Sequence, residues 1–336
     1  MSKRTLLIGN GINRIFEGQN VTHKAQNSFV SVTTRKTPSW NDMLAIVSAK
    51  FGIPHSTNDH IPAPVVFENI VNSKSGDRKH DARIRKLKET IASVIGNSAL
   101  QANDYHRKIM EMPEYDDILT TNYDYCLEKS VIPDFMNQRG GLAVNKDEYA
   151  YSLKRRYQIA DKQVWHIHGE LYNSKKVTGS HYYSESILIG FEQYCLYLEN
   201  IIKNIKDKRP VPQHNHQKNW TYLSLVQRME DSDYNLDDSP FWVDRFFASD
   251  IDIIGLSFDF SETHLWWLLS HRVRLMDEGR VGNKIRYFYP DMDDTLDQTT
   301  KAAGIRYMLN SLNVECVPVR CRDYEDFYAK FVDGSY

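Results

Sequence analysis

The chain has 336 residues, with 42 Lys and Arg against 44 Asp and Glu, so its formal net charge is −2. This near-neutral balance excludes a bulk electrostatic attraction to nucleic acid or to an anionic membrane surface. The hydrophobic fraction of 41% and the charged fraction of 26% are typical of a globular protein and exclude a disordered one.

The first residues give no sign of a targeting segment. A short basic start, Met1 to Arg4, runs into an apolar stretch of four residues that ends at Gly9. That stretch is too short for the core of a signal peptide. No apolar run approaches the roughly 20 residues of a membrane-spanning helix. We therefore expect a cytoplasmic protein without a membrane partner.

Short apolar strands followed by helical stretches recur along the chain. The predicted strands lie at residues 5–8, 117–121, 164–167, 187–189, 251–254, 285–288 and 314–317. A helix with apolar periodicity is predicted from residue 191 to about 205. This alternation predicts an α/β fold, a Rossmann-like doubly wound sheet of mostly parallel strands. Such sheets bind ligands beyond the carboxyl ends of the strands, where the strand order reverses.

Two regions interrupt the alternation. Residues 38–112 show long helical patterns and little strand signal, which predicts a helical insert containing the basic stretch 74–88. Residues 203–240 predict a long polar connection with a short helix near 221–229. We expect one domain over residues 1–336 that carries both regions.

A G-x-G turn, Gly9-Asn10-Gly11, follows the first predicted strand directly. Glycines at such a turn let the backbone approach a pyrophosphate and place N–H groups at a helix N-terminus. The third glycine of the dinucleotide-binding fingerprint is missing, because position 14 is Arg14. The motif alone is equally compatible with a phosphate cradle and with a plain strand-to-helix turn.

The second predicted strand ends in the run Thr120-Thr121-Asn122-Tyr123-Asp124. Small hydroxyls, an amide and a carboxylate are costly to bury unless they find partners, so this run is a candidate site. The alternative is that Asn122 or Asp124 caps the helix that follows.

The third predicted strand ends in His166-Ile167-His168-Gly169. Residues two apart in an extended segment point the same way, so both histidines are expected on one side. We predict a catalytic imidazole at His168 and a structural role for His166. Gly169 permits close approach of a ligand or of another backbone segment. The spacing supplies no third ligand for a metal pair, so no metal site is predicted.

A G-L-S-F-D motif follows the fifth predicted strand. Gly255 and Ser257 are candidates for contacts to a phosphate or a ribose, and Asp259 for accepting a hydrogen bond from a ribose hydroxyl. The alternative role of Asp259 is to cap the apolar helix that Ser261 opens, with His264 three residues later.

Taken in order, the four motifs resemble the sirtuin-like superfamily of NAD-consuming enzymes, over most of the chain from about residue 6 to 317. In particular, the chain is similar to a bacterial branch that hydrolyses NAD+ as the effector arm of anti-phage defence. The resemblance implies that NAD+ is the substrate and that it is cleaved to nicotinamide and ADP-ribose.

The resemblance also implies a role for each matching residue. Asn122 corresponds to the catalytic asparagine, which contacts the nicotinamide ribose and positions the attacking water. Asp124 corresponds to the aspartate that holds the carboxamide, and His168 to the general base or ribose-hydroxyl partner. The substrate-binding positions implied in this way are Gly9, Asn10, Gly11, Asn13, Thr121, Asp124, Gly169, Gly255, Ser257 and Asp259.

The cysteines favour one branch of this superfamily. Deacylases of the superfamily carry four zinc-binding cysteines in two C-x-x-C pairs, whereas the four cysteines here form no such pair. We therefore predict an NAD+ hydrolase without a metal rather than a protein deacylase or ADP-ribosyltransferase. The second hypothesis is a non-hydrolytic sensor that binds NAD+ or ADP-ribose.

Unregulated loss of NAD+ would harm the host, and the sequence shows no separate sensor domain. We therefore expect control by a homo-oligomer or by a separately encoded regulatory protein. The candidate surfaces are the helical insert and an aromatic-rich helix at residues 241–247, for which core packing is the favoured alternative. The basic stretches 74–88 and 206–209 are expected to be solvated surface rather than a nucleic-acid site.

Overall fold

A computed structural model describes most of the chain. The described residues are 4–15, 20–25, 28–33, 40–53, 61–73, 80–97, 101–143, 152–176, 179–183, 187–207, 209–212, 220–231, 234–292 and 301–336. Residues 74–79 of the predicted basic stretch 74–88, and residue 208 of the stretch 206–209, lie outside them.

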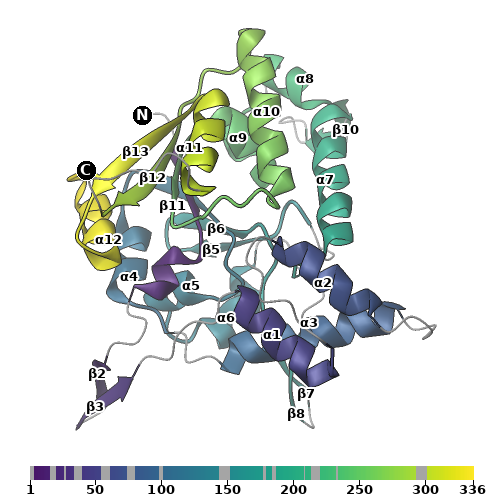
Figure 1. The fold of residues 1–336 in the computed structure, drawn as a ribbon. Helices are drawn as coiled ribbons and strands as arrows, with labels where there is room; N and C mark the ends of the chain where they lie inside the picture. Colours follow the sequence, from purple (N-terminus) through teal and green to yellow (C-terminus); the bar gives the residue numbers. More distant parts are fainter. Residues whose placement is uncertain are drawn as a thin grey trace.

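A seven-stranded sheet forms the centre of the molecule (Figure 1), in the order β13-β12-β11-β1-β4-β6-β5. Its strands are β1 (Arg4–Ile8), β4 (Tyr115–Thr120), β5 (Arg156–Ile159), β6 (Lys162–His166), β11 (Asp250–Ile254), β12 (Ile285–Asp291) and β13 (Val314–Arg320). All neighbours run parallel except β5, which pairs antiparallel with β6. The predicted Rossmann-like doubly wound fold is confirmed.

The strand order reverses beside β1. The chain places β4 and then β6 on one side of β1, and later places β11, β12 and β13 on the other side. In a doubly wound sheet with this order, the crevice at the carboxyl ends of the strands flanking the reversal binds the ligand. The ends of β1 and β11 therefore mark the expected site.

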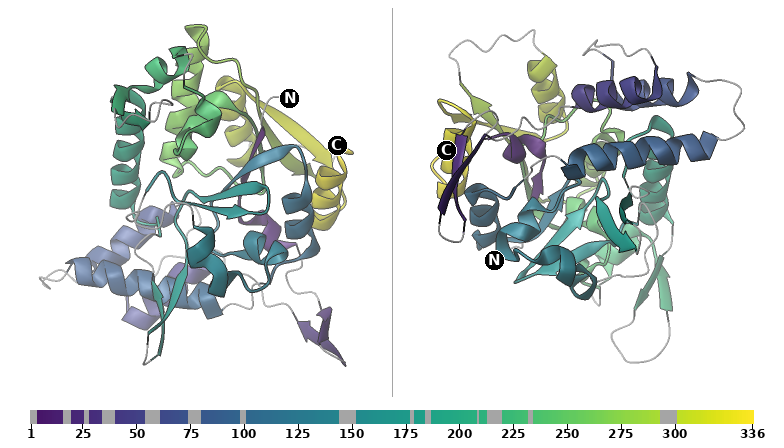
Figure 2. Two further views of the ribbon diagram at one scale, coloured as in Figure 1. Left: turned by 180° about the vertical axis from the view of Figure 1, so that it is seen from behind. Right: turned by 90° about the horizontal axis from the view of Figure 1, so that it is seen from below.

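Helices cover both faces of the sheet (Figure 2). The helices over one face are α7 (Phe191–Lys206), α9 (Arg245–Ala248), α10 (Thr263–Asp277) and α11 (Lys301–Ser311). The helices over the other face are α4 (Asp104–Glu111), α5 (Cys126–Val131), α6 (Phe135–Leu142) and α12 (Tyr324–Asp333). Leu7 packs into the first core, whereas Leu6 and Ile8 pack into the second. This alternation is what a strand buried on both faces requires.

The predicted helical insert forms a third hydrophobic core. Its helices, besides α4, are α1 (Trp40–Phe51), α2 (Ala63–Asn72) and α3 (His80–Asn97). Leu44, Phe67 and Leu87 are fully buried in this core, which also contains Tyr123 and Leu171 from the loops after β4 and β6. The insert therefore packs against the carboxyl edge of the sheet, and Figure 1 shows α1 to α3 below that edge.

Three two-stranded antiparallel pairs are described outside the central sheet. They are β2 (Asn20–Ala25) with β3 (Ser28–Thr33), β7 (Tyr172–Lys176) with β8 (Gly179–Tyr183), and β9 (Arg209–Pro212) with β10 (Trp220–Leu223). The helix predicted near 221–229 is shorter, α8 (Leu225–Glu230), because β10 occupies the first part of that segment.

One prediction about local structure is wrong, and a second is confirmed in the form that the sequence favours. Residues 187–189 form no strand, although Leu188 N–H donates to the His168 carbonyl at 2.8 Å. Their apolar character reflects packing instead, since Ile187 and Ile189 belong to the core of the helical insert. The segment 241–247 is a 3-10 turn, η3 (Trp242–Asp244), followed by α9. Its aromatic side chains are buried, so the favoured prediction of core packing is confirmed and the segment is not an interaction surface.

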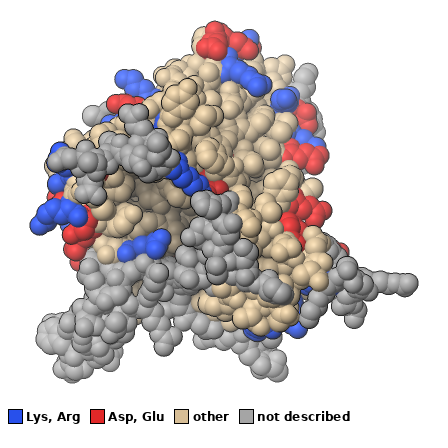
Figure 3. Space-filling model, in the orientation of Figure 1, with Lys and Arg blue, Asp and Glu red and all other residues tan. Residues whose placement is uncertain are grey.

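The described surface carries charges of both signs. On the face shown in Figure 3, Lys and Arg side chains are scattered among Asp and Glu rather than gathered in one stripe. Lys88, in the predicted basic stretch, is buried. Among the helices that the structure describes, none combines the length and apolar character needed to cross a bilayer.

Candidate active site

The loops after four parallel strands meet at the carboxyl edge of the sheet. The turn after β1 is joined to the turn after β11, because Gly9 N–H donates to the Ile254 carbonyl at 3.0 Å and Gly11 N–H to the Gly255 carbonyl at 2.9 Å. Thr121, after β4, donates to the last carbonyl of β1 at 3.1 Å. The residue after β6 donates to the last carbonyl of β4 at 3.0 Å. The fold therefore brings together the four motifs that the sequence separates.

The glycines of these turns permit the close contact between them. A Cβ atom on Gly9 would lie 2.5 Å from the Gly255 carbonyl oxygen. Gly255 has a φ of +65°, and a Cβ there would overlap the Tyr328 hydroxyl. Both glycines are thus required by packing. The N–H groups of Gly9 and Gly11 are bound within the protein, so a phosphate held at this turn would use other donors.

Asn122 lies beside the turn after β1 and is 6% exposed. Its Nδ2 donates to the Gly9 carbonyl at 3.4 Å, and its backbone N–H donates to the Thr120 hydroxyl at 3.0 Å. Its Oδ1 is buried and has no hydrogen-bond partner among the described residues. A buried amide oxygen without a partner is costly, which makes this atom a ready acceptor for a water or a hydroxyl.

Asp124 joins the turn after β1 to the helix after β4. One carboxylate oxygen accepts from Asn13 Nδ2 at 2.8 Å, and the other accepts from the Cys126 N–H at 2.9 Å, at the start of α5. Asn13 Nδ2 also lies 2.7 Å from Asn10 Oδ1. The capping role considered for Asp124 is therefore present, together with a contact to Asn13, another predicted substrate-binding residue.

A buried histidine that the sequence analysis missed completes this network. His106 Nδ1 accepts from the Asn103 N–H at 3.1 Å, so its proton resides on Nε2, which donates to Asn13 Oδ1 at 2.9 Å. Burial lowers the pKa of His106 to about 4, although the Asp124 carboxylate opposes the shift. His106 is thus a neutral support for the turn after β1.

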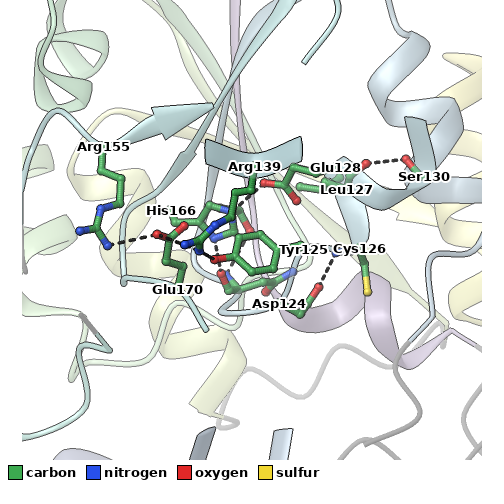
Figure 4. A network of polar contacts seen from close by, with 12 residues as sticks. Asp124, Tyr125, Cys126, Leu127, Glu128, Ser130, Arg139, Arg155, His166 and Glu170 are labelled. Atoms are coloured by element: carbon green, nitrogen blue, oxygen red, sulfur yellow. Dashed lines mark hydrogen bonds and ion pairs between the residues drawn. The ribbon is translucent and has the colours of Figure 1, made fainter. Parts of the chain in front are cut away.

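His166 has both ring nitrogens engaged (Figure 4). Its Nε2 donates to Glu128 Oε1 at 2.7 Å, and its Nδ1 donates to the Asn122 carbonyl at 3.0 Å. Burial alone lowers the pKa of His166, but the Glu128 carboxylate and these hydrogen bonds outweigh it and raise the pKa to about 9. The ring is thus a charged, fully bonded support, which agrees with the structural role predicted for it.

His168 faces two residues from the loop and helix that follow β11. Its Nε2 lies 3.1 Å from His264 Nε2 and 3.1 Å from Glu262 Oε2. Neither Glu262 Oε2 nor His264 Nδ1 has a hydrogen-bond partner among the described residues. Burial lowers the pKa of His264 well below its ordinary value, and the neighbouring His168 lowers it further. The sequence analysis predicted no site role for Glu262 or His264.

His166 and His168 were expected on one side; both line one small cavity, but their rings have different neighbours. Strand β6 ends at His166, and Gly169, with a φ of +85°, closes a turn by donating to the His166 carbonyl at 3.1 Å. The ring centroid of His168 lies 5.9 Å from that of Tyr194, whereas that of His166 lies 5.2 Å from that of Tyr125. The turn therefore gives the two rings different neighbours.

The remaining predicted residues lie near the end of β11. Ser257 is exposed. Asp259 accepts from the Ser261 N–H at 2.9 Å and forms an ion pair with Lys301. Burial tends to raise the pKa of Asp259, but Lys301 and the Ser261 bonds lower it overall. Asp259 thus shapes the turn before α10, and a ribose hydroxyl would compete with Lys301 for it.

Two hollows differ in size and place. A cavity of about 10 Å³ beside His168 is lined by Arg155, His166 and Ile167 among others, which is room for about one water molecule. A wider hollow of about 430 Å³ lies at the amino ends of β4 and β6 and is lined by residues such as Glu111 and Asp161. None of the predicted site residues lines the wider hollow.

Comparison with known proteins identifies a family that part of the chain matches. A family model described as the SIR2-like domain matches residues 116–211. The matched segment contains Asn122 and His168 but neither the turn after β1 nor the turn after β11. This family is one of NAD-related enzymes. No curated protein matches the chain.

Proposed function

Because the chain carries a SIR2-like domain over residues 116–211, we propose that it is an NAD+ glycohydrolase. The reaction cleaves the N-glycosidic bond of NAD+ and releases nicotinamide and ADP-ribose. The predicted catalytic residues are Asn122 and His168.

One observation carries this proposal. The amide oxygen of Asn122 is buried without a partner among the described residues, at the edge of the sheet where the strand order reverses. A doubly wound sheet binds nucleotides at that edge. An acceptor held there by the Gly9 carbonyl through its own Nδ2 is preorganised for a ribose hydroxyl or a water.

The first step of the reaction, loss of nicotinamide, needs no general acid from the protein. When the bond between nicotinamide and ribose breaks, the electron pair goes to the pyridinium nitrogen, so nicotinamide leaves neutral and needs no acid. The anomeric carbon then has oxocarbenium character, as in glycoside cleavage. Water attacks this carbon and must lose a proton. Asn122 would orient the water or the ribose, and the His168 imidazole would accept the proton.

Hydrolysis is favoured over deacylation by the cysteines. The four thiols, of which Cys126 and Cys321 are buried, are free and lack the paired spacing of a zinc module. That module helps to form the acyl-peptide cleft of a deacylase, so its absence from the sequence favours water as the acceptor of ADP-ribose.

The test is a separation of products after the purified chain is incubated with NAD+. We expect wild-type protein, alone or with the products of neighbouring genes, to release nicotinamide and ADP-ribose, and Asn122→Ala to release neither under the same conditions. His271, on α10 and in contact with Trp267 and Phe247, gives the matched control His271→Gln, which should keep activity. NAD+ that stays intact with wild type, alone and with the products of neighbouring genes, contradicts the proposal. Bound but uncleaved NAD+ would support the sensor hypothesis instead.

We also propose a wider role for this activity. An enzyme that depletes NAD+ suits the effector arm of a bacterial anti-phage system, in which the infected cell stops growing. Such an effector must be silent at rest, so we propose control by self-assembly or by a separately encoded protein. Light scattering of the pure chain, compared before and after addition of candidate partners, checks this part. A monomer that is fully active alone contradicts it.

A further inference from the structure

We propose that His168, Glu262 and His264 form a binding site for a divalent transition-metal ion, and that an ion held there withdraws His168 from NAD+ cleavage. The first part stands on the geometry alone, and the second rests on the proposed function. The sequence analysis predicted no metal site, because it lacked a third ligand for the two histidines at the end of β6.

The spacing of the three side chains fits coordination. His168 Nε2 lies 3.1 Å from both His264 Nε2 and Glu262 Oε2, and one donor atom from each residue can be chosen within 4.8 Å of the others. Ligand atoms bonded to Zn²⁺ at about 2.0–2.1 Å in a tetrahedron lie about 3.3 Å apart. Small adjustments of the side chains would therefore place an ion among them.

The hydrogen bonds among His168, Glu262 and His264 do not use all of their donor and acceptor atoms. Two imidazole nitrogens that face each other at 3.1 Å can share only one proton. Glu262 Oε2 and His264 Nδ1 have no hydrogen-bond partner among the described residues, and the His264 side chain is fully buried. Buried polar atoms without partners are rare in native proteins, and a bound ion is one of their ordinary explanations. A cation bound through His264 Nε2 would use the lone pair of Glu262 Oε2 that otherwise stays unpaired among the described residues.

The donor set selects the class of ion. Two imidazoles and one carboxylate favour Zn²⁺ and related transition metals, whereas Mg²⁺ and Ca²⁺ prefer oxygen ligands alone. The surroundings hold the rings in place, since the Tyr194 and Tyr197 ring centroids lie 5.5 and 5.6 Å from that of His264. Three protein ligands leave the fourth position of a tetrahedron for a water molecule.

The two halves of the site come from distant parts of the chain. His168 follows β6, whereas Glu262 and His264 lie at the start of α10, after β11. An ion would therefore join the loops on either side of the strand reversal. A histidine nitrogen bound to a metal cannot accept a proton, so occupancy would suppress the role proposed for His168.

Binding is tested with Zn²⁺ as the only probe. Chelator-treated wild type, Glu262→Gln and the control His271→Gln are titrated with Zn²⁺ by calorimetry, with circular dichroism to verify folding. We expect wild type and His271→Gln to bind one more Zn²⁺ than Glu262→Gln, or to bind it at least about ten-fold more tightly. Any Zn²⁺ sites elsewhere on the chain are present in all three proteins, so they do not contribute to the difference between the titrations. Equal stoichiometry and equal affinity in all three proteins overturn the site.

A second measurement does not depend on a variant. Wild-type crystals grown with Zn²⁺ are expected to show an anomalous-scattering peak bonded to His168, Glu262 and His264. A peak at other residues only, or no peak here when Zn²⁺ is bound in solution, overturns the site.

Activity separates the two parts of the proposal. Saturating Zn²⁺ should lower nicotinamide release at least about ten-fold in wild type and in His271→Gln, and a chelator should restore it. Full NAD+ turnover while Zn²⁺ occupies the site would overturn the proposal that the ion inhibits cleavage. No turnover in chelator-treated protein, either alone or with the products of neighbouring genes, contradicts the proposed function, while the titration and the crystal still decide the site.

Discussion

Two histidines two positions apart, His166 and His168, lie in opposite kinds of surroundings. Both nitrogens of His166 donate to fixed oxygen acceptors, one on Glu128 and one on the backbone of Asn122. His168 instead faces a second imidazole and a carboxylate oxygen that lacks a hydrogen-bond partner among the described residues. The turn closed by Gly169 causes this difference.

The comparison teaches how to separate a supporting histidine from a reactive one. A ring whose donors are all paired with buried acceptors is charged and fixed, so it stabilises the loops around it. A ring that faces groups with unused lone pairs can still exchange a proton or a ligand. The surroundings, rather than the residue type or the strand position, decide between the two roles.

The largest expected effect is on activity at the reactive histidine. His168→Ala should lower NAD+ cleavage by about 10²- to 10⁴-fold, because general base catalysis contributes that much. Circular dichroism should show that the chain stays folded, and His271→Gln serves as the control. Wild-type turnover in folded His168→Ala would break the comparison.

The supporting histidine should act on stability instead. His166→Ala leaves the Glu128 carboxylate buried without its partner, and breaking a buried pair in this way costs about 3–5 kcal/mol. Denaturant unfolding measures the loss. The double variant His166→Leu with Glu128→Leu should recover part of it, because no charge is then left buried. Unchanged stability in His166→Ala would show that the pair is not structural.

A third buried histidine, His106, extends the comparison to the pH dependence of folding stability. Its pKa falls from 6.5 to about 4 in the folded chain. Below pH 6.5 this histidine becomes protonated in the unfolded chain but stays neutral in the folded chain. The free energy of unfolding therefore decreases as the pH falls from 6.5 to about 4. The shift corresponds to about 3 kcal/mol. Unfolding curves between pH 7 and 4 should be flatter for His106→Gln, and an equal slope would contradict the neutral assignment.

The smallest effect is expected at the turn that separates the two rings. Gly169→Ala forces an alanine to a φ of +85°, which costs about 1–2 kcal/mol. Gly279, with a φ of +72° and open space where a Cβ atom would lie, gives the matched control Gly279→Ala. Both variants should lose similar stability in denaturant, but only Gly169→Ala should lose NAD+ cleavage. Equal activity in both would show that the turn does not position His168.

The fold could be predicted from the sequence because strand burial leaves a local pattern. The run Leu6-Leu7-Ile8 is apolar throughout, and the structure buries it on both faces. The same reasoning failed at residues 187–189, which are equally apolar. There the side chains pack against the helical insert, and a short apolar run does not reveal whether its backbone pairs with another strand.

The candidate site was predictable only in part. The rule that parallel strands present their carboxyl ends at one edge brought Gly9 and Asn122 into one prediction, and they are in contact. Glu262, His264 and His106 were missed because that rule singles out residues directly after strands, whereas these residues lie at the start of α10 or within α4. His106 meets Asn13 from 93 positions away, and His264 meets His168 from 96. A useful signal was present, since Glu262 closely follows the motif at the end of β11.

The central claim is that the carboxyl edge at the strand reversal binds NAD+. A crystal structure of His168→Ala with NAD+ tests it most directly, because the variant should bind substrate without consuming it. We predict the nicotinamide ribose against Asn122 and the pyrophosphate against the outer side of the joined turns after β1 and β11. NAD+ bound elsewhere, such as in the wide hollow at the amino ends of β4 and β6, would contradict the account.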